Sequence, residues 1–84
     1  MKPIRLSGHA TEQLHRRGVT MDEVVAAIQG AEWVPVERGR LECRMDFPFD
    51  AEWNKKHYQT KQVRPIFVDE AEAIVIITVY SFYF

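Results

Sequence analysis

Residues 74–80 read Ile-Val-Ile-Ile-Thr-Val-Tyr, and they form the strongest β-forming run of this 84-residue sequence. β-branched side chains fill almost every position, which is typical of a strand covered by neighbours on both sides. The run is too short to cross a bilayer as a helix. We therefore expect a central strand here, which residues 81–84 continue.

The residues before this strand predict a partner for it. Residues 62–68 have the composition of a strand despite Pro65, and the acidic residues 69–72 predict the turn that joins the two strands. Residues 47–58 contain Pro48 and several charged side chains, so we expect a loop there.

Further upstream, residues 41–46 alternate between apolar and polar side chains, as half-buried strands do. Residues 33–37 predict a shorter strand, and Pro35 within it favours an edge position. A turn at residues 38–40 would join the two strands into a hairpin. Cys43 falls on the apolar positions of this pattern, and we interpret it as inert core.

Two short helices are predicted before the strands. The first runs from Ser7, a good N-cap residue, to Gly18, which follows three basic residues and suits a C-cap. The second begins with a capping box formed by Thr20 and Glu23, and Gly30 ends it. The resulting helix-turn-helix unit does not predict DNA binding, because its second helix has acidic residues and no Arg or Lys where a recognition helix contacts DNA.

These elements predict a single α+β domain over residues 1–84, in which two N-terminal helices pack on a three- to four-stranded antiparallel sheet. The lone cysteine excludes a disulfide within the chain, and residues 1–6 contain no apolar signal region, so we expect a cytoplasmic protein. A net charge of −1 and a pI near 6.3 disfavour a non-specific nucleic-acid binder. However, residues 53–64 carry four bases and no acid, which keeps a local basic face open.

A few side chains could carry chemistry. His9 lies at a helix start, where the helix dipole favours a neutral imidazole that can act as a general base; the alternative is a capping histidine. Arg16 and Arg17 follow about two turns later and could bind phosphate, or could simply complement the helix dipole. Tyr80 could donate a proton to a leaving oxygen, or its ring could belong to the core.

A second group of basic and aromatic residues has the composition of an RNA-binding surface, since cations hold phosphates and rings stack on bases. Its members are Lys55, Lys56, His57, Tyr58, Lys61 and Arg64. Lys61 and Arg64 are three apart, so a strand would point them to opposite faces. The three histidines match no standard metal-site spacing, and we expect neither a metal nor a cofactor.

Several short motifs resemble a small bacterial family known only as a domain of unknown function, near the RelE/ParE-like toxins. They are Leu-Ser-Gly-His-Ala at 6–10, Arg-Arg-Gly-Val-Thr at 16–20, Asp-Glu-Val at 22–24 and Thr-Val-Tyr at 78–80. The resemblance covers most of the chain and is poor over residues 47–58. It implies helices on a four-stranded antiparallel sheet, an antitoxin partner, and either ribosome-linked RNA cleavage or gyrase inhibition.

The resemblance extends to individual residues. His9 and Arg17 match the histidine and arginine of the family's first helix, and Tyr80 matches its closing tyrosine. Gln13 stands where another arginine is often expected, which weakens a phosphate-binding role for that helix face. Lys61 and Arg64 fall where related toxins carry basic residues on the sheet.

Three hypotheses follow from these residues. The first is a metal-independent ribonuclease, in which His9 acts as base or acid, Arg17 clamps phosphate and Tyr80 assists. The residues expected to bind RNA in that case are Lys61, Arg64 and Arg16. The second is a non-catalytic protein-interaction module, with homodimers formed through the apolar C-terminal strand. The third is a relative that has lost its activity.

Overall fold

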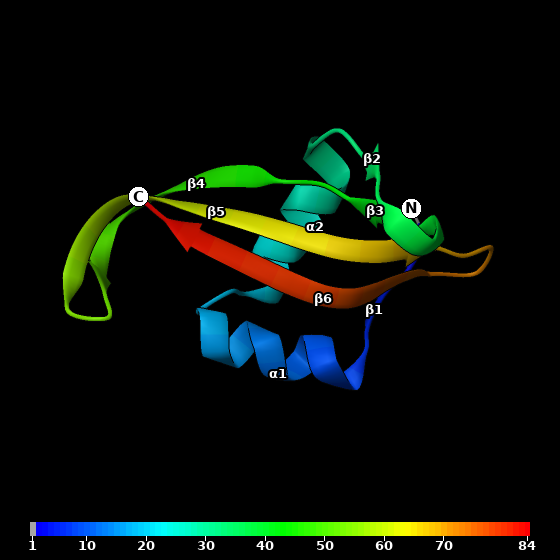
Figure 1. Ribbon diagram of the computed structural model, residues 1–84, viewed down its shortest axis with the longest axis horizontal. Helices are drawn as coiled ribbons and strands as arrows, with labels where there is room; N and C mark the ends of the chain where they lie inside the picture. Colours follow the sequence, from blue (N-terminus) through cyan, green and yellow to red (C-terminus); the bar gives the residue numbers. More distant parts are fainter. Residues whose placement is uncertain (1) are drawn as a thin grey trace.

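β5 and β6 form the centre of the structure, a computed structural model that describes residues 2–84 (Figure 1). All other elements pack against these two strands or extend from them. In chain order the elements are β1 (Ile4–Leu6), α1 (Gly8–Arg17), α2 (Met21–Gly30), β2 (Val34–Pro35), the 3-10 turn η1 (Glu37–Gly39), β3 (Leu41–Glu42), β4 (Met45–Trp53), β5 (Lys56–Asp69) and β6 (Ile74–Tyr83).

The sheet contains six strands among the described residues, in the order β1-β6-β5-β3-β2, with β4 also paired to β5. The α+β class and the two N-terminal helices are confirmed. The predicted antiparallel sheet of three to four strands is corrected in two respects, because the sheet is larger and it is mixed. β1 pairs in parallel with the start of β6, Ile4 opposite Ile74, and this pairing gives the apolar residues of β1 a buried neighbour.

Residues 47–58 are not the loop that Pro48 suggested. They form most of β4 and the start of β5, which meet at a two-residue turn where Asn54 and Lys55 both have positive φ angles of 51° and 67°. Two successive left-handed residues make the hairpin turn that matches strand twist. Proline is tolerated in β4 because this strand pairs with β5 alone.

The helix boundaries are confirmed by their caps. The Ser7 hydroxyl accepts a hydrogen bond from the Ala10 N–H, and Gly18 ends α1 in the left-handed conformation at φ 65°. Thr20 and Glu23 form the expected capping box at the start of α2. Neither helix within residues 2–84 is long and apolar enough to cross a membrane.

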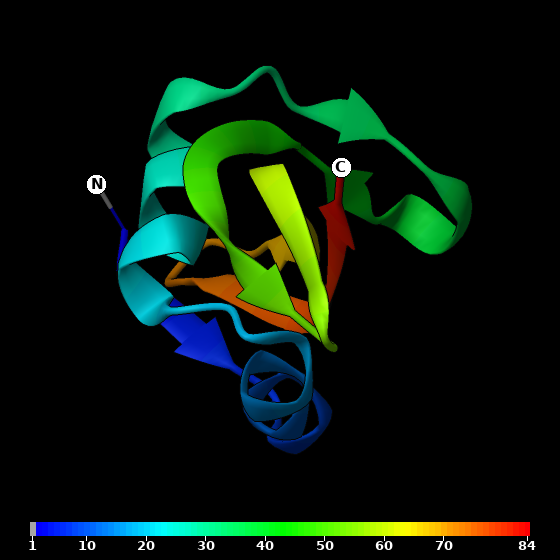
Figure 2. The same ribbon diagram turned by 90° about the vertical axis from the view of Figure 1, so that its left-hand side faces the viewer.

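The two faces of the sheet have different neighbours. Figure 2 shows α2 and η1 on opposite sides of the central strands. The helix-covered face holds the core, whose fully buried side chains include Val24, Ala27, Ile28, Val63, Phe67, Ile76 and Val79. We call the other side the open face. It carries the half-buried and exposed side chains that alternate with the core residues along β5 and β6.

Candidate functional site

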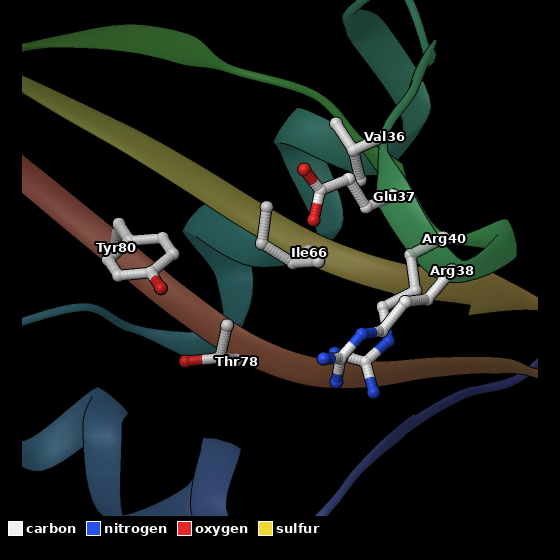
Figure 3. A pocket seen from close by; sticks show the side chains of 7 residues that line it. All are labelled: Val36, Glu37, Arg38, Arg40, Ile66, Thr78 and Tyr80. Carbon is white, nitrogen blue, oxygen red and sulfur yellow. The ribbon is translucent and has the colours of Figure 1, made fainter.

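The open face contains a cleft of about 540 Å³ between the η1 turn and strands β5 and β6 (Figure 3). The side chains that line it come from segments far apart in the sequence. They are Val36, Glu37, Arg38, Arg40, Ile66, Thr78 and Tyr80. This cleft is the candidate functional site, because charged, hydroxyl and aromatic groups converge on one hollow of the surface.

The η1 turn positions the two arginines of the cleft. Arg38 and Gly39 both have positive φ angles, 63° and 69°, which reverse the chain within a few residues. The Val36 N–H donates a 2.9 Å hydrogen bond to the Arg40 carbonyl and closes this reversal. As a result, the side chains of Arg38 and Arg40 both extend from the turn and line the cleft (Figure 3).

Tyr80 forms the opposite rim of the cleft, on β6. Its side chain lies on the open face and is 37% exposed, with the hydroxyl directed towards Thr78 (Figure 3). The Arg17 guanidinium carbon lies 4.8 Å from the centre of the Tyr80 ring, which is a cation–π contact. The end of α1 therefore supplies a third cation to this region.

Arg64 is the cross-strand partner of Tyr80 and lies on the same face. Its guanidinium carbon is 4.7 Å from the centre of the Phe82 ring. Its Nε is 3.9 Å from the Glu42 carboxylate, which is longer than a hydrogen bond, so this ion pair is a loose one. Four arginines and two glutamates make the region net positive on a chain of net charge −1. Such a focused field attracts anions even though the whole molecule is slightly acidic.

The backbone under Arg17 is fixed from two sides. The Ser81 hydroxyl and the Tyr83 hydroxyl donate to the Arg17 carbonyl at 3.0 Å and 2.6 Å. Burial raises the pKa of Tyr83 and favours its protonated form, which is the form that donates this hydrogen bond. Trp53, at the far end of β4, stacks on the Tyr83 ring with ring centres 4.8 Å apart. The last turn of α1 is thus anchored to β6, and the β4–β5 hairpin folds over the anchor.

The structure brings together some of the residues that the sequence singled out and separates others. Arg17, Tyr80 and Arg64 gather on or beside the cleft, whereas Arg16 is exposed next to Arg17. His9 is exposed near the start of α1, about 12 Å from Arg17 along the helix axis. The role predicted for His9 stays a prediction, and this histidine does not line the cleft.

Lys61 lies on the other face of β5, as the spacing to Arg64 predicted. It is 4% exposed, and its ammonium group contacts the Gly18 carbonyl and, at 2.8 Å, the Glu23 carboxylate. Lys61 therefore joins β5 to the start of α2. The proposed RNA contact of Lys61 is replaced by this structural role, since burial leaves its charge little access to solvent.

The remaining basic residues of the 53–64 segment lie at the end of the β4–β5 hairpin, away from the cleft (Figure 1). His57 contacts the Asp50 carboxylate at 2.8 Å, and Lys56 lies 5.4 Å from the centre of the Tyr58 ring. Both contacts are local to the hairpin. Arg64 is therefore the cation that this segment contributes to the candidate site.

None of the charged residues that line the cleft was singled out from the sequence, namely Glu37, Arg38 and Arg40. The Arg-Gly-Arg turn at 38–40 was the only local signal, and it predicted a reversal of the chain without indicating what the side chains would face. No family model, curated protein or solved structure matches this chain. Within residues 2–84, no three of the His, Cys, Asp and Glu side chains gather where they could share a metal ion.

Proposed function

We propose that this protein is a metal-independent endoribonuclease of the toxin type, and that RNA is cleaved in the arginine-lined cleft. The observation that carries the proposal is the arrangement of Glu37, Arg38 and Arg40 on one side of the cleft and Tyr80 on the other. A carboxylate, a pair of guanidinium groups and a phenol are the groups that phosphodiester cleavage needs when RNA supplies its own nucleophile.

The chemistry can be assigned to these residues in one transesterification step. The Glu37 carboxylate accepts the proton of the ribose 2′-hydroxyl, whose oxygen attacks the adjacent phosphorus. Arg38 and Arg40 stabilise the negative charge on the phosphorane, since guanidinium groups match phosphate oxygens in pairs. The bond from phosphorus to the 5′ oxygen breaks, and the Tyr80 hydroxyl gives its proton to that oxygen. The products are a 2′,3′-cyclic phosphate and a 5′-hydroxyl end.

The resemblance to RelE/ParE-like toxins supports the same reading, because the closing tyrosine and the arginine of the first helix lie together at the cleft rim. Arg17, stacked on Tyr80, adds positive charge beside the reacting phosphate. The proposal gives the role of base to Glu37 rather than to His9, because Glu37 lines the cleft. An antitoxin partner and a cytoplasmic location belong to the same proposal.

The test is cleavage of a fluorescent single-stranded RNA in buffer containing EDTA. We expect Glu37→Gln and the double variant Arg38→Ala/Arg40→Ala to lose at least about 100-fold in rate. The matched control is Lys55→Ala/Lys56→Ala, which removes two charges from the far end of the hairpin and should keep the rate. His9→Ala should also keep it. Equal losses in the cleft and control variants, or no cleavage by the folded wild type, would reject the ribonuclease.

A non-catalytic interaction module is the second candidate. Phe82 and Phe84 favour it, since their side chains are 41% and 59% exposed on the open face. Exposed aromatic rings at the end of a strand are typical of surfaces that bind a partner or a second copy of the chain. A monodisperse dimer in light scattering, together with no RNA cleavage, would favour this function over the first.

A further inference from the structure

We infer that Tyr80, Phe82 and Phe84 form a base-stacking track for single-stranded RNA, which leads out of the cleft along β6. This inference rests on the proposed function, because it names the form of RNA that the cleft receives. We call these three side chains the aromatic track. The track lies on the open face and continues from the cleft rim towards residue 84.

Strand geometry puts the three rings in one row. Residues two apart on a strand point to the same face, and their spacing along β6 is about 6.8 Å. The exposed fractions of the side chains rise along the row, from 37% for Tyr80 to 41% for Phe82 and 59% for Phe84. Only the first ring lines the cleft, so the other two offer apolar surface beyond the reacting phosphate.

Cations accompany the row. The Arg17 guanidinium lies over the Tyr80 ring and the Arg64 guanidinium over the Phe82 ring, at 4.8 Å and 4.7 Å from the ring centres. Alternating rings and arginines suit single-stranded nucleic acid, whose bases stack on rings while its phosphates approach the cations. The four arginines of this region outnumber its two glutamates, and the resulting positive field complements the phosphate backbone of a nucleic acid. Charge and aromatic placement together therefore favour a nucleic acid as the occupant.

The track is held rigid by the sheet. Tyr80 and Phe82 are paired across to β5, and Phe84 exchanges two backbone hydrogen bonds with Thr60, at 2.7 Å and 3.0 Å. Rings that are ordered before binding cost less entropy when a base stacks on them. The backbone of the last residue of the track is therefore fixed to β5, as the backbone of the first is.

The spacing of the rings selects single strands. Bases in a duplex strand follow one another at about 3.4 Å and are already stacked on their neighbours. The rings of the track repeat at about twice that distance. Only an extended strand with unstacked bases can place one base on each ring. Phe82 and Phe84 should therefore not increase the affinity of the protein for a duplex.

Fluorescence anisotropy with labelled oligonucleotides tests the track. To prevent cleavage, the probes carry 2′-O-methyl groups and have two or six nucleotides, the six-nucleotide probe being used both single-stranded and in a duplex. We expect Phe82→Ala/Phe84→Ala to weaken binding of the single-stranded hexanucleotide by roughly tenfold or more and to leave the dinucleotide unchanged. Val34→Ala is the matched control, because Val34 is 44% exposed on β2 and lies outside the track.

The outcomes separate the two proposals. If the double variant binds the hexanucleotide as tightly as the wild type does, the track is rejected while dinucleotide binding still supports the cleft. If the wild type binds neither probe, the proposed function fails and the track fails with it. Light scattering that shows a wild-type dimer and a monomeric double variant would assign the rings to a second copy of the chain. Phe84→Ala alone, checked by circular dichroism, replaces the double variant if that variant does not fold.

Discussion

The guanidinium of Arg17 lies over the ring of Tyr80, which joins the last turn of α1 to β6 at the rim of the cleft. Both residues were singled out from the sequence for one hypothesis, Arg17 as a phosphate clamp and Tyr80 as an assisting group. Their contact places a positive charge next to a phenol. In the ribonuclease proposed above, this pair would supply both a proton donor and an anion-binding group.

Tyr80→Phe isolates the contribution of the hydroxyl group. The ring and its contact with Arg17 are retained, so RNA affinity should stay within about twofold of the wild type. The cleavage rate should fall by about 100-fold or more, since the proton donor to the leaving oxygen is gone. Single-turnover kinetics and anisotropy measure the two quantities. Tyr58→Phe, in the hairpin, is the control, and an unchanged rate for Tyr80→Phe would remove Tyr80 from the chemistry.

Gly18→Ala should destabilise the protein strongly. The residue has a φ of 65°, and a Cβ atom there would lie 2.6 Å from Trp53 and 2.9 Å from the Tyr83 hydroxyl. Gly39→Ala is the matched control, because its φ is 69° but a Cβ atom would meet nothing within 4 Å. We expect a loss of about 1 kcal/mol in the free energy of unfolding for Gly39→Ala, from the backbone alone, and about 2–4 kcal/mol for Gly18→Ala. Urea titration checks both; equal losses would mean that the Trp53 contact contributes nothing.

Lys61→Met keeps much of the buried apolar stem and removes the charge. Glu23 would lose its partner in a partly buried site, and the Gly18 carbonyl would lose a donor. We expect the free energy of unfolding to fall by about 2–3 kcal/mol. The double variant Lys61→Met/Glu23→Gln should recover part of this loss, because no unpaired carboxylate remains. Thermal unfolding of the four proteins forms a double-mutant cycle, and strictly additive losses would show that the pair is not coupled.

Cys43 should be inert towards thiol reagents in the folded protein. Burial, assisted by the nearby Glu42 carboxylate, raises the pKa of its thiol from 9.0 to about 11. At about pH 8 the thiolate fraction is then on the order of one in a thousand. Alkylation should be slow in native buffer and fast in denaturant, as followed by mass spectrometry. Rapid modification of the native protein would contradict the buried position.

The raised pKa of the Cys43 thiol also makes the free energy of unfolding depend on pH. Because the folded state has the higher pKa, it holds the thiol proton more tightly than the unfolded chain does. The contribution of Cys43 to stability is therefore complete below about pH 9 and is lost as the pH rises through about 11. Cys43→Ala should reduce the slope of the free energy of unfolding against pH in that interval. Urea titrations at several alkaline pH values give that slope.

Local signals made the helices and the central strand predictable from the sequence. The helix caps are formed by Ser7, Gly18 and Thr20, which make hydrogen bonds to backbone groups only three or four residues away. Their effect on the chain therefore depends little on the rest of the fold. The β-branched run at 74–80 likewise predicts a strand that is covered on both edges. β1 was harder to predict as a strand, because three residues acquire a strand conformation only when β6 lies beside them.

The β4–β5 hairpin and the cleft could not be predicted from the sequence, because both depend on contacts between separate elements of the fold. Pro48 and Asp50 predicted a loop, yet an outer strand with a bulge between Pro48 and Ala51 accepts both. The turn at Asn54 lacked the usual glycine at its second position. The cleft includes Glu37, Arg38 and Arg40 only because β6 passes beneath η1. Lys61 does not belong to the site, because its side chain lies on the opposite face of β5 and contacts α2.

The parallel pairing of β1 with β6 also determines when the fold can be completed during synthesis of the chain. Residues 4–6 leave the ribosome early but have no partner until residues 74–76 have been translated. Arg17 likewise cannot contact Tyr80 before residue 80 has been translated. The cleft and its rim therefore cannot form on the nascent chain until β6 is complete. A nuclease built in this way would be harmless to the messenger and the ribosome that are producing it until β6 has emerged from the exit tunnel.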